Sequence, residues 1–100
     1  MGKYVYIYYD GTNGSDSGDN EAWGKWFKEL GSKIVDAGNP FDPAGQAVHQ
    51  GGVMPVNEKP ATGYSIINAE NMEEATALAK GCPLMGAKDS AVCVYEALPM

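Results

Sequence analysis

"KYVYIYYD", residues 3–10, is the stretch of the sequence that decides the fold. β-Branched and aromatic residues dominate it, which is typical of a β-strand. The side chains of a strand alternate between its two faces, so residues 5, 7 and 9 point to one side and Tyr4, Tyr6 and Tyr8 to the other. Neither side has the polar character of a surface that faces water.

Two helices and three more strands are predicted after this strand. Trp23, Trp26, Phe27, Leu30 and Ile34 recur at three- and four-residue steps, which predicts an amphipathic helix over residues 20–37 that ends at Gly38. A second helix is predicted over residues 71–80, with Asn71 as its cap and Glu74 as the reciprocal partner. The loop between the first strand and the first helix covers residues 11–20. Further strands are predicted at residues 44–52, 61–69 and 90–98.

The predicted order β-α-β-β-α-β is that of a ferredoxin-like α+β fold. A chain of 100 residues is expected to form one domain over residues 1–100. The fold would hold a four-stranded antiparallel sheet with both helices on one face. The other face of the sheet would then be bare.

The tyrosines of the first strand predict a homodimer. Val5 and Ile7 suit the side that the helices cover, which leaves Tyr4, Tyr6 and Tyr8 on the bare side. An exposed patch of three tyrosines is unusual on a monomer. A homodimer in which the sheets of the two copies face each other would bury it. The alternative is a hydrated, tyrosine-rich surface.

Composition excludes several classes of protein. The net charge is −6, and seven scattered lysines with no arginine argue against nucleic-acid binding. No apolar run approaches the length of a membrane span, so we expect a cytoplasmic protein. Cys82 and Cys93 are expected to be unpaired thiols.

No metal site and no cofactor are expected. The segment that begins at Asp10 contains several Asp and Asn residues, but it does not have the spacing of a calcium loop. Thr12 and Gly14 occupy its third and fifth positions, where the loop needs ligands. The only histidine, His49, has no cluster of further ligands around it in the sequence. Gly51 and Gly52 indicate a turn and not a phosphate loop.

The chain resembles the YCII-related, or DGPF, domain family. The resemblance rests on "KYVYIYY", "WGKWFKELG", "IVDAGNPF", "ATGYSIINAENMEEATALAKGCP" and "VCVYEALPM", in this order. It implies a ferredoxin-like fold assembled as a dimeric α+β barrel. By resemblance alone, it also implies an association with alternative sigma factors.

The resemblance further implies candidate site residues. Some relatives pair a histidine on the first helix with an aspartate in the turn after it, as a general acid/base dyad. The aspartate corresponds to Asp36, whereas the first helix here has no histidine; His49 is the candidate to replace it.

The aromatic candidates come from the residues themselves. Trp23 and Trp26 are candidates for the wall of an apolar pocket, with packing in the core as the alternative. Tyr8 and Tyr64 are candidates for hydroxyl donors to a ligand, with packing in a dimer as the alternative.

Two functions remain open. The first is a non-catalytic protein that binds a small molecule, or an accessory protein linked to transcription regulation. The second is a small lyase- or isomerase-like enzyme that uses Asp36 as general acid/base, with His49 or a tyrosine as its partner. The missing helix histidine favours the first.

Overall fold

The computed structural model describes residues 1–9, 20–42, 44–56, 60–86 and 89–100. The predicted loop at residues 11–20 therefore lies outside the described residues, except for its last position. The elements are β1 (Gly2–Tyr9), α1 (Asn20–Leu30), β2 (Ile34–Asp36), β3 (Gln46–His49), β4 (Gly52–Pro55), β5 (Gly63–Ala69), α2 (Met72–Ala79) and β6 (Ala91–Ala97).

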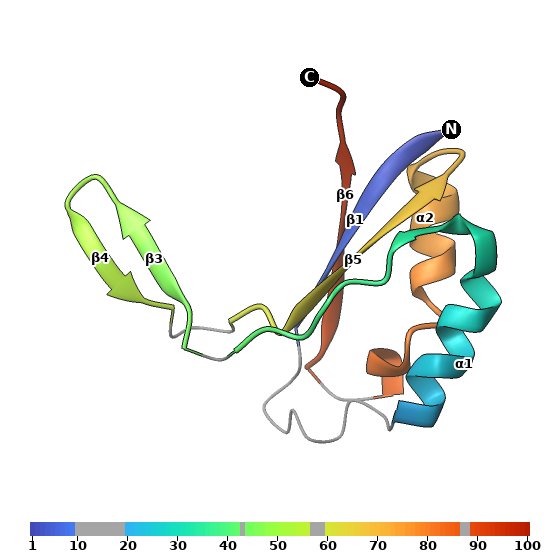
Figure 1. Ribbon diagram of the computed structural model, residues 1–100, viewed down its shortest axis with the longest axis horizontal. Helices are drawn as coiled ribbons and strands as arrows, with labels where there is room; N and C mark the ends of the chain where they lie inside the picture. Colours follow the sequence, from blue (N-terminus) through green and yellow to red (C-terminus); the bar gives the residue numbers. More distant parts are fainter. Residues whose placement is uncertain (10–19, 43, 57–59, 87–88) are drawn as a thin grey trace.

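The body of the protein is a four-stranded antiparallel sheet in the order β2-β5-β1-β6, with both helices on one face (Figure 1). This order and layering are those of the ferredoxin-like fold, and the predicted fold class is confirmed. The long central pair β1 and β5 forms the middle of the sheet. Among the described residues, neither helix is long and apolar enough to cross a membrane.

The first helix ends earlier than its periodicity predicts. Gly31 adopts a left-handed conformation with φ +55, and a short 3-10 turn over Gly31–Lys33 follows α1. The chain then enters β2, whose Ile34 pairs with Ile67 of β5. The predicted helix over residues 20–37 is therefore wrong in its last part. Ile34 packs against the core as expected, but it does so from a strand.

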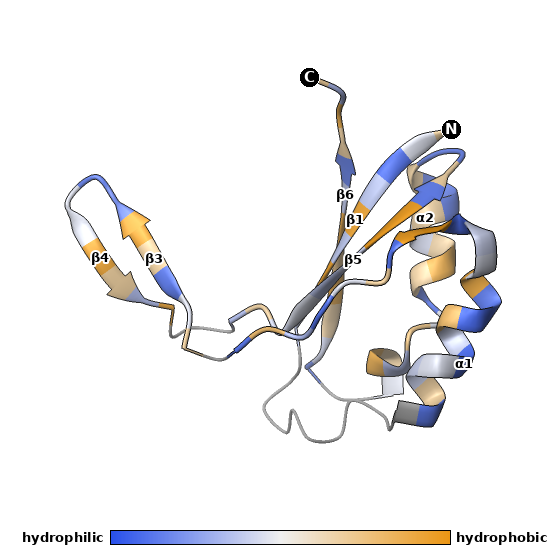
Figure 2. Cartoon of the chain, in the orientation of Figure 1, coloured by the Kyte–Doolittle hydropathy of each residue, from blue (hydrophilic) through white to orange (hydrophobic). Residues whose placement is uncertain are grey.

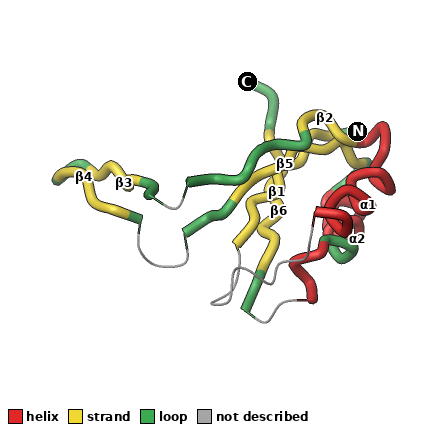
Figure 3. Tube along the Cα trace, turned by 60° about the horizontal axis from the view of Figure 1, so that its bottom comes forward, coloured by secondary structure: helices red, strands yellow, loops and turns green. Residues whose placement is uncertain are grey.

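The strand predicted at residues 44–52 exists as β3, but its predicted place in the main sheet is wrong, because the edge strand there is β2. Residues 46–55 form a separate two-stranded hairpin, β3 and β4, which we call the arm. The arm projects from the sheet on the side opposite to the helices, and two views agree on this (Figures 1 and 3). The radius of gyration, 14.3 Å, exceeds the about 13 Å of a compact 100-residue domain, as a projecting arm requires.

The faces of β1 are the reverse of those predicted. Tyr4, Tyr6 and Tyr8 are only 2%, 0% and 6% exposed and lie under the helices. Tyr6 donates a hydrogen bond of 2.6 Å to the backbone carbonyl of Ala75 in α2, so its hydroxyl is satisfied inside the core. The tyrosines cannot serve as a dimer surface, and this part of the homodimer prediction is wrong.

The other side of the sheet, which we call the open face, carries the aliphatic residues Val5 and Ile7 of β1 with tyrosine, cysteine and isoleucine side chains of the neighbouring strands. Strand register places Val5 between Ile66 and Tyr95, and it places Ile7 between Tyr64 and Cys93. These side chains are partly or largely exposed in the single chain. A second copy of the chain would have to meet this face and not the tyrosines.

The remaining elements confirm the predictions from the sequence. β5 and β6 lie within the predicted strands, and α2 begins at its predicted cap. The Asn71 side chain accepts a hydrogen bond of 2.8 Å from the Glu74 backbone N–H. The Glu74 carboxylate in turn accepts from the backbone N–H of Glu70 at 3.0 Å.

Candidate functional site

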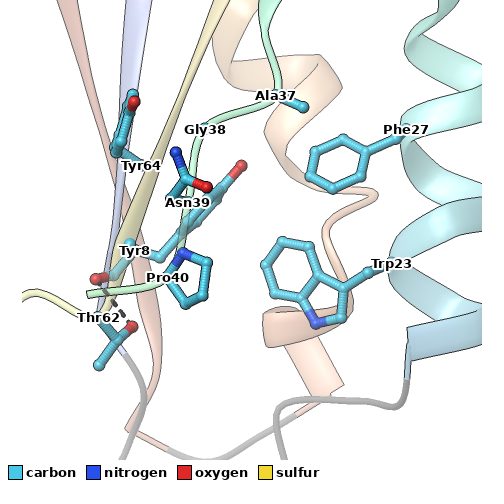
Figure 4. A pocket seen from close by; sticks show the side chains of 10 residues that line it. Tyr8, Trp23, Phe27, Ala37, Gly38, Asn39, Pro40, Thr62 and Tyr64 are labelled. Atoms are coloured by element: carbon cyan, nitrogen blue, oxygen red, sulfur yellow. Dashed lines mark hydrogen bonds between the residues drawn. The ribbon is translucent and has the colours of Figure 1, made fainter. Parts of the chain in front are cut away.

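A pocket of about 290 Å³ lies between α1, the loop of residues 37–40 and the adjoining ends of β1 and β5 (Figure 4). Its wall combines aromatic rings with backbone and small side chains. The lining residues are Tyr8, Trp23, Phe27, Ala37, Gly38, Asn39, Pro40, Thr62, Gly63 and Tyr64. This volume is at the lower end of the range for small-molecule sites and suits a ligand with a single ring.

Glycines allow the loop of residues 37–40 to lie directly against β5. Gly38 has φ +81, and a Cβ atom there would meet the carbonyl oxygen of Tyr64 at 1.7 Å. A side chain at this position would therefore push the loop away from the strand. Across from it, a Cβ on Gly63 would come within 3.1 Å of the Asn39 carbonyl oxygen. The close approach of these two backbones fixes one wall of the pocket.

Aromatic rings from α1 form the opposite wall. Trp23 and Phe27 point from α1 toward the loop across the pocket (Figure 4). The Trp23 ring packs edge-on against Tyr8, with 5.1 Å between centroids and 78° between planes. Phe27 lies 5.8 Å from Trp23, one helical turn along α1. These contacts, edge-to-face for Tyr8 and tilted at 41° for Phe27, hold the rings in defined orientations before any ligand arrives.

A chain of hydroxyl groups ties the pocket floor to the loop. The Tyr8 hydroxyl donates to Ser65 Oγ at 2.7 Å, and the Ser65 hydroxyl donates to the Ala37 carbonyl at 2.6 Å. Burial raises the pKa of Tyr8 well above its ordinary value of 10.0, although the Ser65 hydrogen bond acts in the opposite direction. Tyr8 therefore stays protonated near neutral pH and cannot act as a general base.

Asp36 lies outside the pocket, at the end of β2. One carboxylate oxygen accepts the Gly38 backbone N–H at 2.8 Å, which makes a local turn that holds the loop of residues 37–40. The other oxygen lies 3.4 Å from the Tyr64 hydroxyl. The carboxylate is exposed to solvent. Asp36 thus positions the loop through its backbone contact and presents its second oxygen to Tyr64.

Tyr64 borders the pocket without pointing its ring into it. Its neighbours Gly63 and Ser65 face the helices, so alternation along β5 sends the Tyr64 ring to the open face. In Figure 4 the ring lies on the far side of β5 from Trp23 and Phe27. There it stacks on Phe41, with 5.7 Å between centroids and 21° between planes.

The other two candidates lie elsewhere. Trp26 is 3% exposed and donates its indole N–H to the Leu78 carbonyl at 3.2 Å, so it packs in the core and does not line the pocket. His49 lies at the end of β3, exposed on the arm. The arm extends away from the sheet that carries Asp36, so one chain does not bring His49 and Asp36 together (Figure 1).

Several lining residues were not among the sequence-based candidates. The helical stripe predicts Phe27 as a core residue, and the patterns used for the sequence analysis do not single out Asn39 or Pro40. The signal that could have found them is the segment "AGNP" followed by a return to "TGY", because glycines in both segments permit close backbone approach. In the part of the chain that the structure describes, no three His, Cys, Asp or Glu side chains gather as metal ligands.

A solved enzyme structure shares this architecture. It is the 5-chloro-2-hydroxyhydroquinone dehydrochlorinase of Burkholderia phenoliruptrix AC1100, in complex with 2,5-dihydroxybenzoquinone. The TM-score is 0.62 over 93% of this chain and 90% of the enzyme, at 18% sequence identity. Neither a protein-family model nor a curated protein matches the chain. At this identity the likeness establishes the α+β fold.

Proposed function

We propose that the protein binds a small, flat, uncharged ligand with one ring, of the hydroquinone type, in the aromatic pocket. The observation that carries the proposal is the chemistry of the wall. The described lining residues supply aromatic rings, backbone groups and amide or hydroxyl side chains, and they include no Asp, Glu, His, Lys or Cys. Such a wall offers stacking and hydrogen bonds and holds no charge for a charged ligand.

The pocket supports recognition more than acid/base chemistry. Tyr8 is the ionisable side chain that faces its interior, and burial keeps this phenol protonated. Trp23 and Phe27 provide the stacking faces, while the exposed amide of Asn39 is a hydrogen-bond partner for a ring hydroxyl. The dihydroxybenzoquinone held by the structurally similar enzyme is a ring of the size that this pocket accommodates.

Calorimetry with hydroquinone and cyclohexane-1,4-diol tests the proposal. The two probes have the same size and hydroxyl positions, and only hydroquinone has a flat ring. We expect hydroquinone to bind and the saturated diol to bind at least tenfold more weakly. Trp23→Leu should weaken hydroquinone binding about tenfold, since one aromatic contact contributes about 0.5–1.5 kcal/mol beyond buried area.

Phe41→Leu is the matched control for Trp23→Leu. Phe41 is also an aromatic residue near the loop, but it stacks on Tyr64 on the open face and does not line the pocket. Its replacement should leave hydroquinone binding unchanged. Equal affinity of the wild-type protein and Trp23→Leu, or equal affinity for both probes, would contradict the proposal.

The second candidate function is a lyase- or isomerase-like enzyme that uses Asp36. It is favoured by the exposed Asp36 carboxylate, which accepts from the Tyr64 hydroxyl at 3.4 Å, because a carboxylate beside a phenol can take a proton from a ligand that lies on the same face. This pair lies on the open face, away from the pocket. Asp36→Asn retains an oxygen to accept the Gly38 N–H and removes the charge.

Mass spectrometry of chlorinated and unchlorinated hydroxyhydroquinones, incubated with each protein, separates the two functions. Under the enzyme reading the wild-type protein converts a probe and Asp36→Asn does not. Conversion that survives in Asp36→Asn excludes Asp36 as the acid/base group. If the wild-type protein binds a probe and does not convert it, the enzyme function is excluded and the ligand-binding function remains.

A further inference from the structure

Ser65 is a buried polar residue in β5. Its side chain is 1% exposed, and hydropathy colouring shows much of this strand as hydrophobic (Figure 2). A hydroxyl in such surroundings is unfavourable unless it is hydrogen-bonded. Ser65 Oγ lies 2.7 Å from the Tyr8 hydroxyl and 2.6 Å from the Ala37 carbonyl oxygen, and both Tyr8 and Ala37 line the pocket. Ser65 therefore connects two lining residues without lining the pocket itself.

The Ala37 carbonyl fixes the direction of both hydrogen bonds. A carbonyl oxygen can only accept, so the single hydroxyl proton of Ser65 must point at Ala37. Ser65 then has no proton for Tyr8 and must accept from it. Burial raises the pKa of Tyr8, which keeps on the phenol the one proton that Ser65 accepts. The Tyr8 hydroxyl is thus held as a donor to Ser65 and offers only its lone pairs to a ligand.

Other donors at the pocket wall are engaged in the same way. The Thr62 hydroxyl donates to the backbone carbonyl of Tyr8 at 3.1 Å (Figure 4), and the Gly38 N–H donates to Asp36 at 2.8 Å. The Asn39 side-chain amide carries both a donor and an acceptor, so it can bond to either kind of ring oxygen. The Tyr8 oxygen is therefore the group that distinguishes a ligand that donates from a ligand that only accepts.

Tyr8 lies where a bound ring would meet it. Its side chain extends from β1 toward the loop of residues 37–40 (Figure 4), and its ring packs edge-on against Trp23 at 5.1 Å. A ring hydroxyl beside the Tyr8 oxygen gains a hydrogen bond. A ring carbonyl at the same place brings two acceptors together, and it loses its hydration without a new bond.

We propose that the chain Tyr8–Ser65–Ala37 makes the pocket selective for ring hydroxyls over ring carbonyls. Within the ligand class of the proposed function, on which this inference rests, the pocket then binds a hydroquinone in preference to the corresponding quinone. Tyr8 is the specificity-determining residue, because its oxygen contacts the ligand. Ser65 is a positioning residue, because it holds the Tyr8 proton away from the ligand.

Selective binding of the reduced form changes the redox equilibrium of the ligand. A hydroquinone and its quinone differ by two electrons and two protons, and tighter binding of one form shifts the equilibrium toward that form. Each tenfold preference for the hydroquinone raises the reduction potential of the bound pair by about 30 mV. The pocket would thereby hold its guest in the reduced state.

Calorimetry with hydroquinone and 1,4-benzoquinone tests the selectivity. Both probes are flat, uncharged and of one size, and they differ in the hydrogens on their two oxygens. We expect the wild-type protein to bind hydroquinone about tenfold more tightly, since a site built to bond to a hydroxyl rejects an analogue without one. Titration at about pH 6 keeps the thiols protonated and slow to add to the quinone. Mass spectrometry afterwards checks that no adduct has formed.

Two variants should abolish the preference. Tyr8→Phe removes the acceptor, so it should weaken hydroquinone binding and leave benzoquinone binding unchanged. Ser65→Ala releases the Tyr8 proton, so it should strengthen benzoquinone binding. Thr76→Val is the control, because Thr76 is an exposed residue of α2 whose hydroxyl donates to the Met72 and Glu73 carbonyls at 3.0 Å. Both dissociation constants should be unchanged in Thr76→Val.

The ratio of the two dissociation constants separates selectivity from a structural role. A loosened pocket would weaken both probes by the same factor, and that result in Tyr8→Phe and Ser65→Ala overturns the inference. A wild-type ratio near one, or a ratio that survives in Tyr8→Phe, overturns it as well. Equal binding of both probes leaves the proposed function standing, whereas failure of hydroquinone to bind removes the proposed function and this inference together.

Discussion

On its covered face β1 presents Tyr4, Tyr6 and Tyr8, whereas on its open face it presents Val5 and Ile7. The helix α2 above the covered face is rich in small residues such as Ala75 and Ala79. Large rings fill the space that these alanines leave, and a hydroxyl at the end of a ring reaches a helix carbonyl, as in Tyr6. Aliphatic side chains suit a flat apolar partner. The comparison teaches that tyrosines on a strand can belong to the interior when small residues lie opposite.

The largest expected effect distinguishes adjacent residues on the two faces. Tyr6→Ala should lower the free energy of unfolding by about 3–5 kcal/mol, because it leaves a cavity against Trp26 and Ala75. Ile7→Ala should cost about 2 kcal/mol or less in the single chain, where Ile7 is only partly buried. Urea unfolding at low protein concentration measures both. Equal losses in the two variants would refute the assignment of faces.

The second-largest effect is expected from alkaline pH, which should lower the free energy of unfolding through Tyr6 on the covered face. Burial raises the pKa of Tyr6, and the nearby Cys82 and Glu74 raise it further, so the folded chain holds this proton more tightly than the unfolded chain does. The resulting stability is fully present below pH 10.0, the ordinary tyrosine value, and is lost as pH rises above it. Tyr6 contributes a loss of up to about 1.4 kcal/mol per pH unit there.

Urea unfolding at pH 9, 10 and 11 measures this loss. The slope of stability against pH should be shallower in Tyr6→Phe, which has no hydroxyl to titrate. An identical slope in Tyr6→Phe and the wild-type protein would show that the alkaline loss comes from other groups.

The smallest expected effect compares hydroxyl groups on the two faces. Tyr8→Phe removes the donor to Ser65 Oγ and should cost about 1 kcal/mol, while Ser65 keeps its own bond to Ala37. Tyr95→Phe makes the same change on the open face, where Tyr95 is 58% exposed, and should stay within about 0.5 kcal/mol of the wild-type stability. Thermal melts of both variants test the difference. A larger loss in Tyr95→Phe would mean that the open-face hydroxyl is the structural one.

Most of the fold could be predicted from local patterns. The alternation in residues 63–69 and the cap at Asn71 specify their elements directly, because each signal is contained in a few neighbouring residues. The end of α1 could not be predicted from such a local signal. Ile34 continues the helical period beyond Leu30, and only the left-handed conformation of Gly31 shows where the helix stops.

The faces of the sheet and the pocket depend on tertiary contacts. Alternation divides β1 into two sets of side chains without saying which set is covered, and that depends on Ala75 and other residues far along the chain. The sequence did suggest Tyr8, Trp23 and Tyr64, which border the pocket. It could not show that the loop around Gly38 would close that pocket, because the close approach joins segments about 25 residues apart.

The intrinsic fluorescence of the two tryptophans should report whether the pocket is occupied. Trp23 lines the pocket, whereas Trp26 is enclosed by the core, and their ring centroids are 5.8 Å apart. At this separation excitation passes readily between the indoles, so an absorbing guest beside Trp23 should quench the emission of both. Replacing Trp26 with Phe would leave one emitter at the pocket wall. Occupancy can then be followed in unlabelled protein, at dilutions where heat measurements lose their signal.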